Sequence, residues 1–122
     1  MKDYLHKYDL IHQNQIIRST IERLGVGVSI TDPNQEDNPI IYVNEGFTKI
    51  TGYEPEEVLG LNARFLQGDN PDPIKFYEIE DGVSENKPVR IRLKNFKKDG
   101  TPFWNFLNIF RVTIEELNES FF

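Results

Sequence analysis

The fold is decided by a stretch in which the apolar pattern changes to a period of two, VRIRLKNFKKDGTPFWNFLNI, residues 89–109. Its first half alternates Val, Ile and Leu with basic side chains, so one face of a strand is apolar and the other is charged. The Asp-Gly pair at 99–100 is typical of a hairpin turn. An aromatic strand follows, which we expect to span 102–114. The stretch therefore predicts an antiparallel hairpin with one face toward a core.

Two carboxamides interrupt the apolar rows of this hairpin. Asn95 ends the row of the first strand, and Asn105 lies in the row of the second between Phe103 and Leu107. A buried amide without partners costs about 1–3 kcal/mol, so each must bond either to backbone at a strand end or to a polar ligand. An amide offers a donor and an acceptor side by side, which suits a heterocycle edge that alternates carbonyl and N–H groups.

Outward from the hairpin, helical spacing over residues 4–24 predicts an amphipathic helix that flanks the core. We expect short strands at 26–30 and 40–43, and helices at 45–50, 54–59, 62–67 and 73–83. Residues 120–122 look like a strand cut off as it begins. This order predicts an α+β domain over 25–122, with short helices on one face of an antiparallel five-stranded sheet.

Composition limits the function classes. The chain has 122 residues, enough for one domain, and its net charge of −6 argues against a nucleic-acid partner. It has no run long enough for a membrane span and no cysteine, so we expect a cytoplasmic protein without thiol chemistry or disulfides. We find no nucleophile–base pair and no metal-ligand cluster, and His6 and His12 suit a solvated helix face. The sequence therefore predicts no enzyme.

The helix expected at 62–67 carries a second polar group. Asn62, Arg64 and Gln67 lie within about two turns, with Phe65 and Leu66 as apolar anchors. Amides suit a polyhydroxyl chain and an arginine suits a phosphate, although an isolated arginine is more often a solvated surface cation. A flat apolar slot between this group and the two hairpin amides would be a cofactor pocket.

The segment GLNARFLQ, residues 60–67, resembles the signature of LOV domains, the flavin-binding blue-light sensors of the PAS superfamily, whose pattern is Gly-x-Asn-Cys-Arg-Phe-Leu-Gln. The resemblance covers roughly residues 25–122 and includes further matching segments at 27–32, 42–47, 51–53, 95–100 and 103–105. The chain is most similar to bacterial LOV domains of the kind found in Bacillus photoreceptors, which also carry an N-terminal helix. The resemblance implies the PAS/LOV fold.

The resemblance also implies a cofactor site. Asn62 and Gln67 would contact the ribityl chain of FMN, Arg64 its phosphate, and Asn95 and Asn105 the pyrimidine edge of its ring system. The apolar wall around the rings would be formed by Val28, Ile30, Thr31, Leu66, Leu107 and Ile109.

The chain departs from the family at Ala63, where LOV domains have their reactive cysteine. In the family, that thiol adds to the flavin after blue-light excitation, and the adduct is the signalling state. Ala63, whether introduced by engineering or natural, cannot form this photoadduct. The resemblance then implies a blue-light-excited, green-fluorescent flavoprotein and photosensitiser, derived from a blue-light photoreceptor.

Two further departures concern the ends of the pocket. Many LOV domains have another arginine where this chain has Glu80, so riboflavin would compete with FMN unless Glu80 faces solvent. The last strand, which is central in the family and carries a glutamine that contacts the flavin, is reached here only at its beginning, up to Phe122. The pocket is then expected to be open on one side, or to be completed by another chain.

An alternative function is a PAS-type interaction or dimerisation module with an empty or differently occupied pocket. The aromatic strand 103–110 and the N-terminal helix favour it, because a sheet face and a flanking helix are common dimer surfaces in PAS proteins. The partners expected are therefore a flavin and a second copy of the chain, joined through the sheet face or the helix. The colour of the purified protein distinguishes the two functions.

Overall fold

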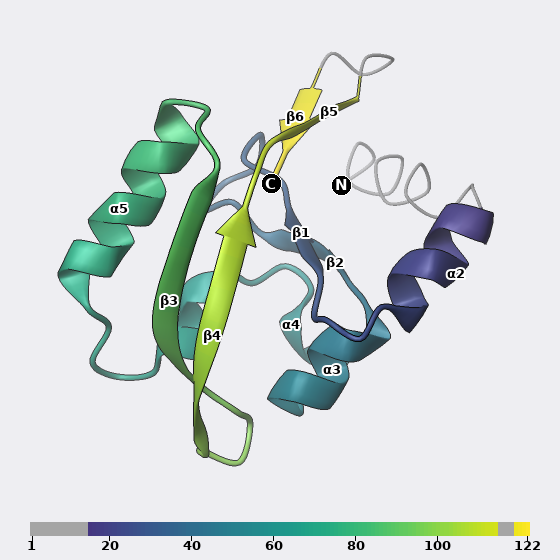
Figure 1. The fold of residues 1–122 in the computed structure, drawn as a ribbon, viewed down its shortest axis with the longest axis horizontal. Coiled ribbons are helices and arrows are strands. Elements are labelled where there is room, and N and C mark those ends of the chain that lie inside the picture. Colours follow the sequence, from purple (N-terminus) through teal and green to yellow (C-terminus); the bar gives the residue numbers. More distant parts are fainter. Residues whose placement is uncertain (1–14, 115–118) are drawn as a thin grey trace.

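The structure, a computed structural model, describes residues 15–114 and 119–122. Its helices are α2 (Gln15–Arg23), α3 (Glu45–Thr51), α4 (Pro55–Val58), the 3-10 helix η1 (Ala63–Gln67) and α5 (Pro73–Ser84). Its strands are β1 (Ser29–Thr31), β2 (Ile40–Val43), β3 (Val89–Phe96), β4 (Pro102–Ile109), β5 (Val112–Ile114) and β6 (Glu119–Phe121). Figure 1 shows β3 and β4 side by side, with α5 next to β3. The α+β class is confirmed.

The β3–β4 hairpin has the predicted register and turn. Leu93 lies opposite Asn105 and Asn95 opposite Phe103, so the two apolar rows share one face. Gly100 has a φ of 89°, a left-handed conformation that glycine adopts without steric cost. Along β3 the inward residues are buried and the outward ones mostly exposed, as the period of two predicts.

The sheet differs from the predicted five-stranded one. The described residues form three two-stranded antiparallel ladders, β1–β2, β3–β4 and β5–β6. The strand expected over 102–114 is broken at residues 110–111, because Ile109 pairs with Val89, the first residue of β3. Beyond Ile109 the chain has no partner on β3, and 112–114 pair with β6 instead.

Backbone hydrogen bonds join the β5–β6 ladder to the β1–β2 ladder, whereas one edge of β4 is left without a partner strand among the described residues. Thr31 and Phe122 exchange two backbone hydrogen bonds, which connect the end of β6 to β1. Within the described part of the chain, β4 pairs with a strand along one edge only. The expected strand at 120–122 is thus present as β6, but it reaches β1 and β5 and not β4.

Local signals explain most element boundaries. Asn44 caps α3, which ends at Gly52 with a φ of 82°, and Asp72 caps α5 with Pro73 following, a residue tolerated in the first helical turn. The segment expected as a helix at 62–67 is a 3-10 turn capped by Asn62. The strand expected at 26–30 is shorter and later, and of the helix expected at 4–24 the described part is α2, while 4–14 lie outside the described residues.

The core consists of two clusters that place η1 against the hairpin. The first joins β2, α3, α4 and η1 through Ile40, Val43, Phe47, Val58 and Leu66. The second joins the inner row of β3 to Ile79 of α5 and to the inner row of β4. η1, which carries the second polar group singled out in the sequence, also contacts β3.

Candidate functional site

The hairpin amides meet on the inner face of the β3–β4 ladder. Asn95 is 2% exposed, and its Oδ1 accepts a hydrogen bond of 2.9 Å from Asn105 Nδ2. Asn95 Nδ2 donates to the Lys94 carbonyl at 3.1 Å. Among the described residues, Asn105 Oδ1 accepts no hydrogen bond, so it remains available to a ligand N–H. The Asn105 amide is therefore held by Asn95, at the end of the apolar row of β3.

The inner face of β4 is incompletely covered by protein. Phe103, Leu107 and Ile109 are half-buried, while the opposing residues of β3 are buried. Leu107 and Ile109 pack on the β3 cluster from one side only. This leaves a partly uncovered apolar strip that leads to the amide pair.

The other residues that the resemblance implies as a pocket wall lie in the first core cluster or in and directly before β1. Leu66 is buried and Ala63 packs against its cluster at the first position of η1. Val28 and Ile30 are half-buried, and Thr31 Oγ1 donates to the Phe122 carbonyl at 3.2 Å. The hydroxyl of Thr31 is therefore engaged with the backbone near the end of β6.

At η1, one residue that the sequence analysis missed holds two of the predicted ligand residues. Arg64 donates from Nη1 and Nη2 to the two carboxylate oxygens of Asp37 at 2.8 and 2.5 Å. Asn62 Nδ2 donates to the Asp37 carbonyl at 2.7 Å. This bidentate pair lowers the pKa of the Asp37 carboxyl and raises that of Arg64, chiefly through the hydrogen bonds. Both side chains are about half exposed, at 54% and 50%.

Gln67 lies between two surface cavities. The larger, about 700 Å³, extends from Gln67 along the segment before α5 to Arg92 and Trp104 of the hairpin. The smaller, about 460 Å³, lies between η1 and α5 and is lined by Arg64, Phe65, Gln67, Gly68, Pro71, Pro73, Phe76 and Tyr77. Glu80 is exposed on α5, as expected of a residue that faces solvent.

The structure thus brings the predicted residues together in two groups, Asn95 with Asn105 and Asn62 with Arg64. It adds Asp37, in a loop where no periodicity gave a signal, and Asn44, whose Oδ1 accepts from Val28 N at 2.8 Å. An Asn directly before a helix is a capping signal that could have identified Asn44.

The described part of the chain contains no helix long and apolar enough to cross a membrane. Nor do the aspartates and glutamates of that part gather anywhere in groups of three that could hold a metal ion.

Comparison with known proteins identifies the family. The PAS domain profile matches residues 25–122. The blue-light photoreceptor of Listeria monocytogenes is 48% identical over 97 residues, which are 80% of this chain and 38% of that protein. The chain spans less than two fifths of the length of the curated relatives it matches.

Solved structures agree with this similarity. The LOV domain of the Erythrobacter litoralis EL346 blue-light activated histidine kinase superposes with a TM-score of 0.74 at 35% identity, covering 81% of this chain and 92% of that one. An RNA-binding light-oxygen-voltage receptor gives a TM-score of 0.82 at 30% identity over 88% of this chain and 30% of that one. The chain therefore belongs to the PAS domain family and, within it, to the LOV domains.

Proposed function

We propose that this LOV domain binds a flavin non-covalently and, for want of a thiol at Ala63, responds to blue light by fluorescence and singlet-oxygen production. The observation that carries the proposal is the Asn95–Asn105 amide pair at the end of a half-covered apolar strip. Relatives named as blue-light photoreceptors support it. A LOV domain is a sensory module, and we propose no catalytic activity for it.

The residues present fit a flavin ring. Its pyrimidine edge alternates acceptors and a donor, and Asn105 Oδ1 is an unengaged acceptor beside the Asn95 amide. The inner row of β4 supplies an apolar surface that a planar ring would cover, which would exclude water from both. When bound, the flavin would supply the blue absorption and the excited state. The chain's own part is to orient the ring through Asn95 and Asn105 and to leave no nucleophile at Ala63.

The tail of the ligand would lie at η1. We assign Arg64 to a phosphate, and Asn62 and Gln67 to the hydroxyls of a ribityl chain, because guanidinium and amide groups match these partners. FMN is then the expected ligand, with riboflavin as its competitor.

The direct test is the spectrum of the purified chain after incubation with FMN or riboflavin and removal of free flavin. A structured blue absorption band with green emission, retained by the protein, supports the proposal. A colourless protein after both incubations would contradict it.

Replacing Asn105 with leucine is expected to weaken flavin binding by about 1–3 kcal/mol, because Asn95 Oδ1 and the ring edge lose their partner while remaining buried. This corresponds to a dissociation constant raised roughly 5- to 150-fold, measured by flavin fluorescence titration. Asn108→Leu is the matched control, since Asn108 is exposed on the opposite face of β4. Equal affinities for the two variants would exclude the amide pair as the ring-binding group.

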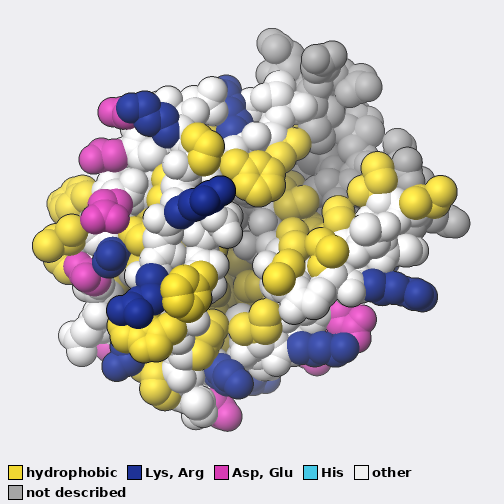
Figure 2. Space-filling view, viewed as in Figure 1, with side chains coloured by type: hydrophobic (Ala, Val, Ile, Leu, Met, Phe, Trp, Pro, Cys, Tyr) yellow, Lys and Arg dark blue, Asp and Glu magenta, His cyan; other side chains and the backbone are white. Residues whose placement is uncertain are grey.

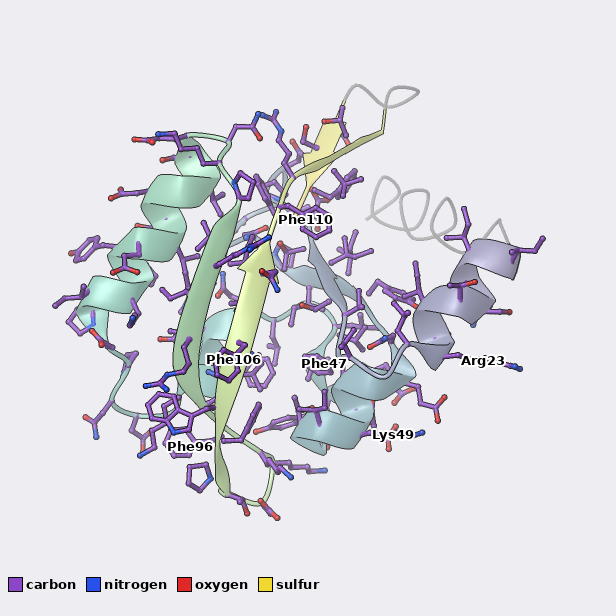
Figure 3. The ribbon with its side chains drawn as sticks, in the orientation of Figure 1. Arg23, Phe47, Lys49, Phe96, Phe106 and Phe110 are labelled. Carbon is purple, nitrogen blue, oxygen red and sulfur yellow. The ribbon has the colours of Figure 1, made fainter. Side chains whose placement is uncertain are left out.

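A second candidate function, self-association, is favoured by the outer face of the hairpin. Trp104, Phe106 and Phe110 are 57%, 75% and 60% exposed, and the Arg92 guanidinium stacks over Trp104 at 4.3 Å. Figure 2 shows hydrophobic and basic side chains gathered over this face, and Figure 3 shows Phe106 and Phe110 along it. Exposed aromatic patches of this kind mark interaction surfaces.

If a second copy covers this face, Phe106→Glu is expected to convert a dimer to a monomer, because a carboxylate would be buried at the centre of the contact. Light scattering coupled to size exclusion measures the mass. Tyr77→Glu on α5, which is also exposed, is the control and should leave the mass unchanged. A monomeric parent chain would dismiss this candidate.

A further inference from the structure

We propose that Asp37 sets the ligand preference of the site: its carboxylate occupies Arg64 and thereby lowers the advantage of FMN over riboflavin. This inference rests on the proposed function, because it concerns the tail of a bound flavin. It assigns a specificity role to a residue outside the segments that resemble the LOV signature.

The first support is the geometry of the pair. Asp37 receives hydrogen bonds from both terminal nitrogens of Arg64, the arrangement a guanidinium uses for a phosphate. Its carbonyl accepts from Asn62 as well. A single loop residue thus already satisfies two of the three side chains expected to hold the ligand's tail.

The second support is that the loop holds Asp37 in this position. Asp37 and Asn38 both have left-handed backbones, with φ of 64° and 47°, a conformation that asparagine and aspartate adopt more readily than other residues with a side chain. The loop is fixed by Asp32, which is fully buried and accepts from Asn34 N at 3.0 Å and from Gln35 Nε2 at 2.8 Å. Because the surrounding contacts maintain this conformation, the Asp37 carboxylate is positioned on Arg64 before a ligand arrives.

The third support is the charge around the smaller cavity. Arg64 is the one charged residue that lines it, and the other lining residues are apolar, glycine or the neutral Gln67. A phosphate there would meet a cation that is already paired with the Asp37 carboxylate. The carboxylate would repel a phosphate, whereas it can accept a hydrogen bond from a hydroxyl of riboflavin.

The opposite role is also defined by this geometry. If Asp37 instead orients Arg64 toward the phosphate, removing its charge would lower the affinity for FMN. The two roles therefore predict shifts of opposite sign in the ratio of FMN to riboflavin affinity.

The experiment measures dissociation constants for FMN and for riboflavin at low ionic strength, by titration of flavin fluorescence. Asp37→Asn removes the charge, and asparagine tolerates the left-handed backbone, so the fold should be kept. We expect the variant to raise the FMN-to-riboflavin affinity ratio about 2- to 5-fold, the size typical of an exposed ion pair. Glu36→Gln is the matched control, since Glu36 is the exposed acid next in the chain, and should leave the ratio unchanged.

A double-mutant cycle tests whether Asp37 changes the FMN-to-riboflavin affinity ratio through Arg64. In an Arg64→Ala background the Asp37→Asn change should no longer alter the ratio, because the shared cation is gone. An unchanged or lowered ratio in Asp37→Asn, with both flavins bound, overturns the role of Asp37 alone. Failure of the parent chain to bind either flavin overturns the proposed function and this inference with it.

Discussion

Replacing Ala63 with cysteine is expected to convert a continuously fluorescent protein into one whose blue absorption band is lost under illumination and returns in the dark. Ala63 is the first residue of η1, half-buried and packed against the core cluster that contains Leu66. The whole chain has no cysteine, so no other thiol can react with a bound flavin. The single methionine, at position 1, carries a thioether and is no substitute. The parent chain should therefore fluoresce steadily.

The matched control for this change is Ala63→Ser, which has nearly the same volume as cysteine but no thiol. Both substitutions add one heavy atom, which the core should accept at a cost of under about 1.5 kcal/mol. Absorption spectra before, during and after blue illumination of the flavin-loaded proteins give the answer. Reversible bleaching in the parent or in the serine variant, or none in the cysteine variant, would remove position 63 as the photochemical site.

The hairpin shows how far a sequence pattern can determine a site. Period-two alternation and an Asp-Gly turn together fix the register of β3 and β4, and the register places Asn95 and Asn105 on the same face. Their contact at 2.9 Å then follows from strand geometry, since diagonal neighbours on one face lie within reach of each other's side chains. Such local rules made this half of the candidate site predictable.

The remaining features depend on contacts between distant segments. The break of the long strand at 110–111 arises because β3 ends its ladder with Val89, while β6 offers a new partner to 112–114. The position of Asp37 depends on a buried Asp32 and on two left-handed residues, which no hydrophobic period encodes. The sequence identified Arg64 as a candidate ligand but gave no indication that a loop carboxylate, 27 positions away, already binds it.

Replacing Asn44 with alanine is expected to lower the free energy of unfolding by about 3–5 kcal/mol, because four hydrogen bonds of a buried side chain are lost together. Asn44 is 1% exposed. Its Oδ1 accepts from Val28 N at 2.8 Å and from Phe47 N at 2.9 Å, and its Nδ2 donates to the carbonyls of Ile21 and Val26 at 2.7 and 3.0 Å. The side chain thus caps α3 and ties the end of α2 to the segment that leads into β1. Alanine would remove the hydrogen-bond partner that Asn44 supplies to each of these backbone groups.

The free energy of unfolding in urea or guanidinium is measured for Asn44→Ala and for two further variants. One keeps part of the Asn44 hydrogen bonding, and the other is a control. Asn44→Asp keeps the acceptor that caps α3 but places a carboxylate oxygen against the two carbonyls, so it should release the end of α2 and also destabilise the chain. Asn70→Ala, in an exposed loop, should change stability by less than about 0.5 kcal/mol. If the free energy of unfolding of Asn44→Ala were within about 1 kcal/mol of that of the parent, the four side-chain hydrogen bonds would not be what joins α2 and α3 to the core.

Asn44 also forms two hydrogen bonds with Val28. The Val28 amide donates to Asn44 Oδ1, and the Val28 carbonyl accepts from Asn44 N at 3.1 Å. The same residue that stabilises the fold therefore sets the position of one proposed wall residue of the flavin pocket.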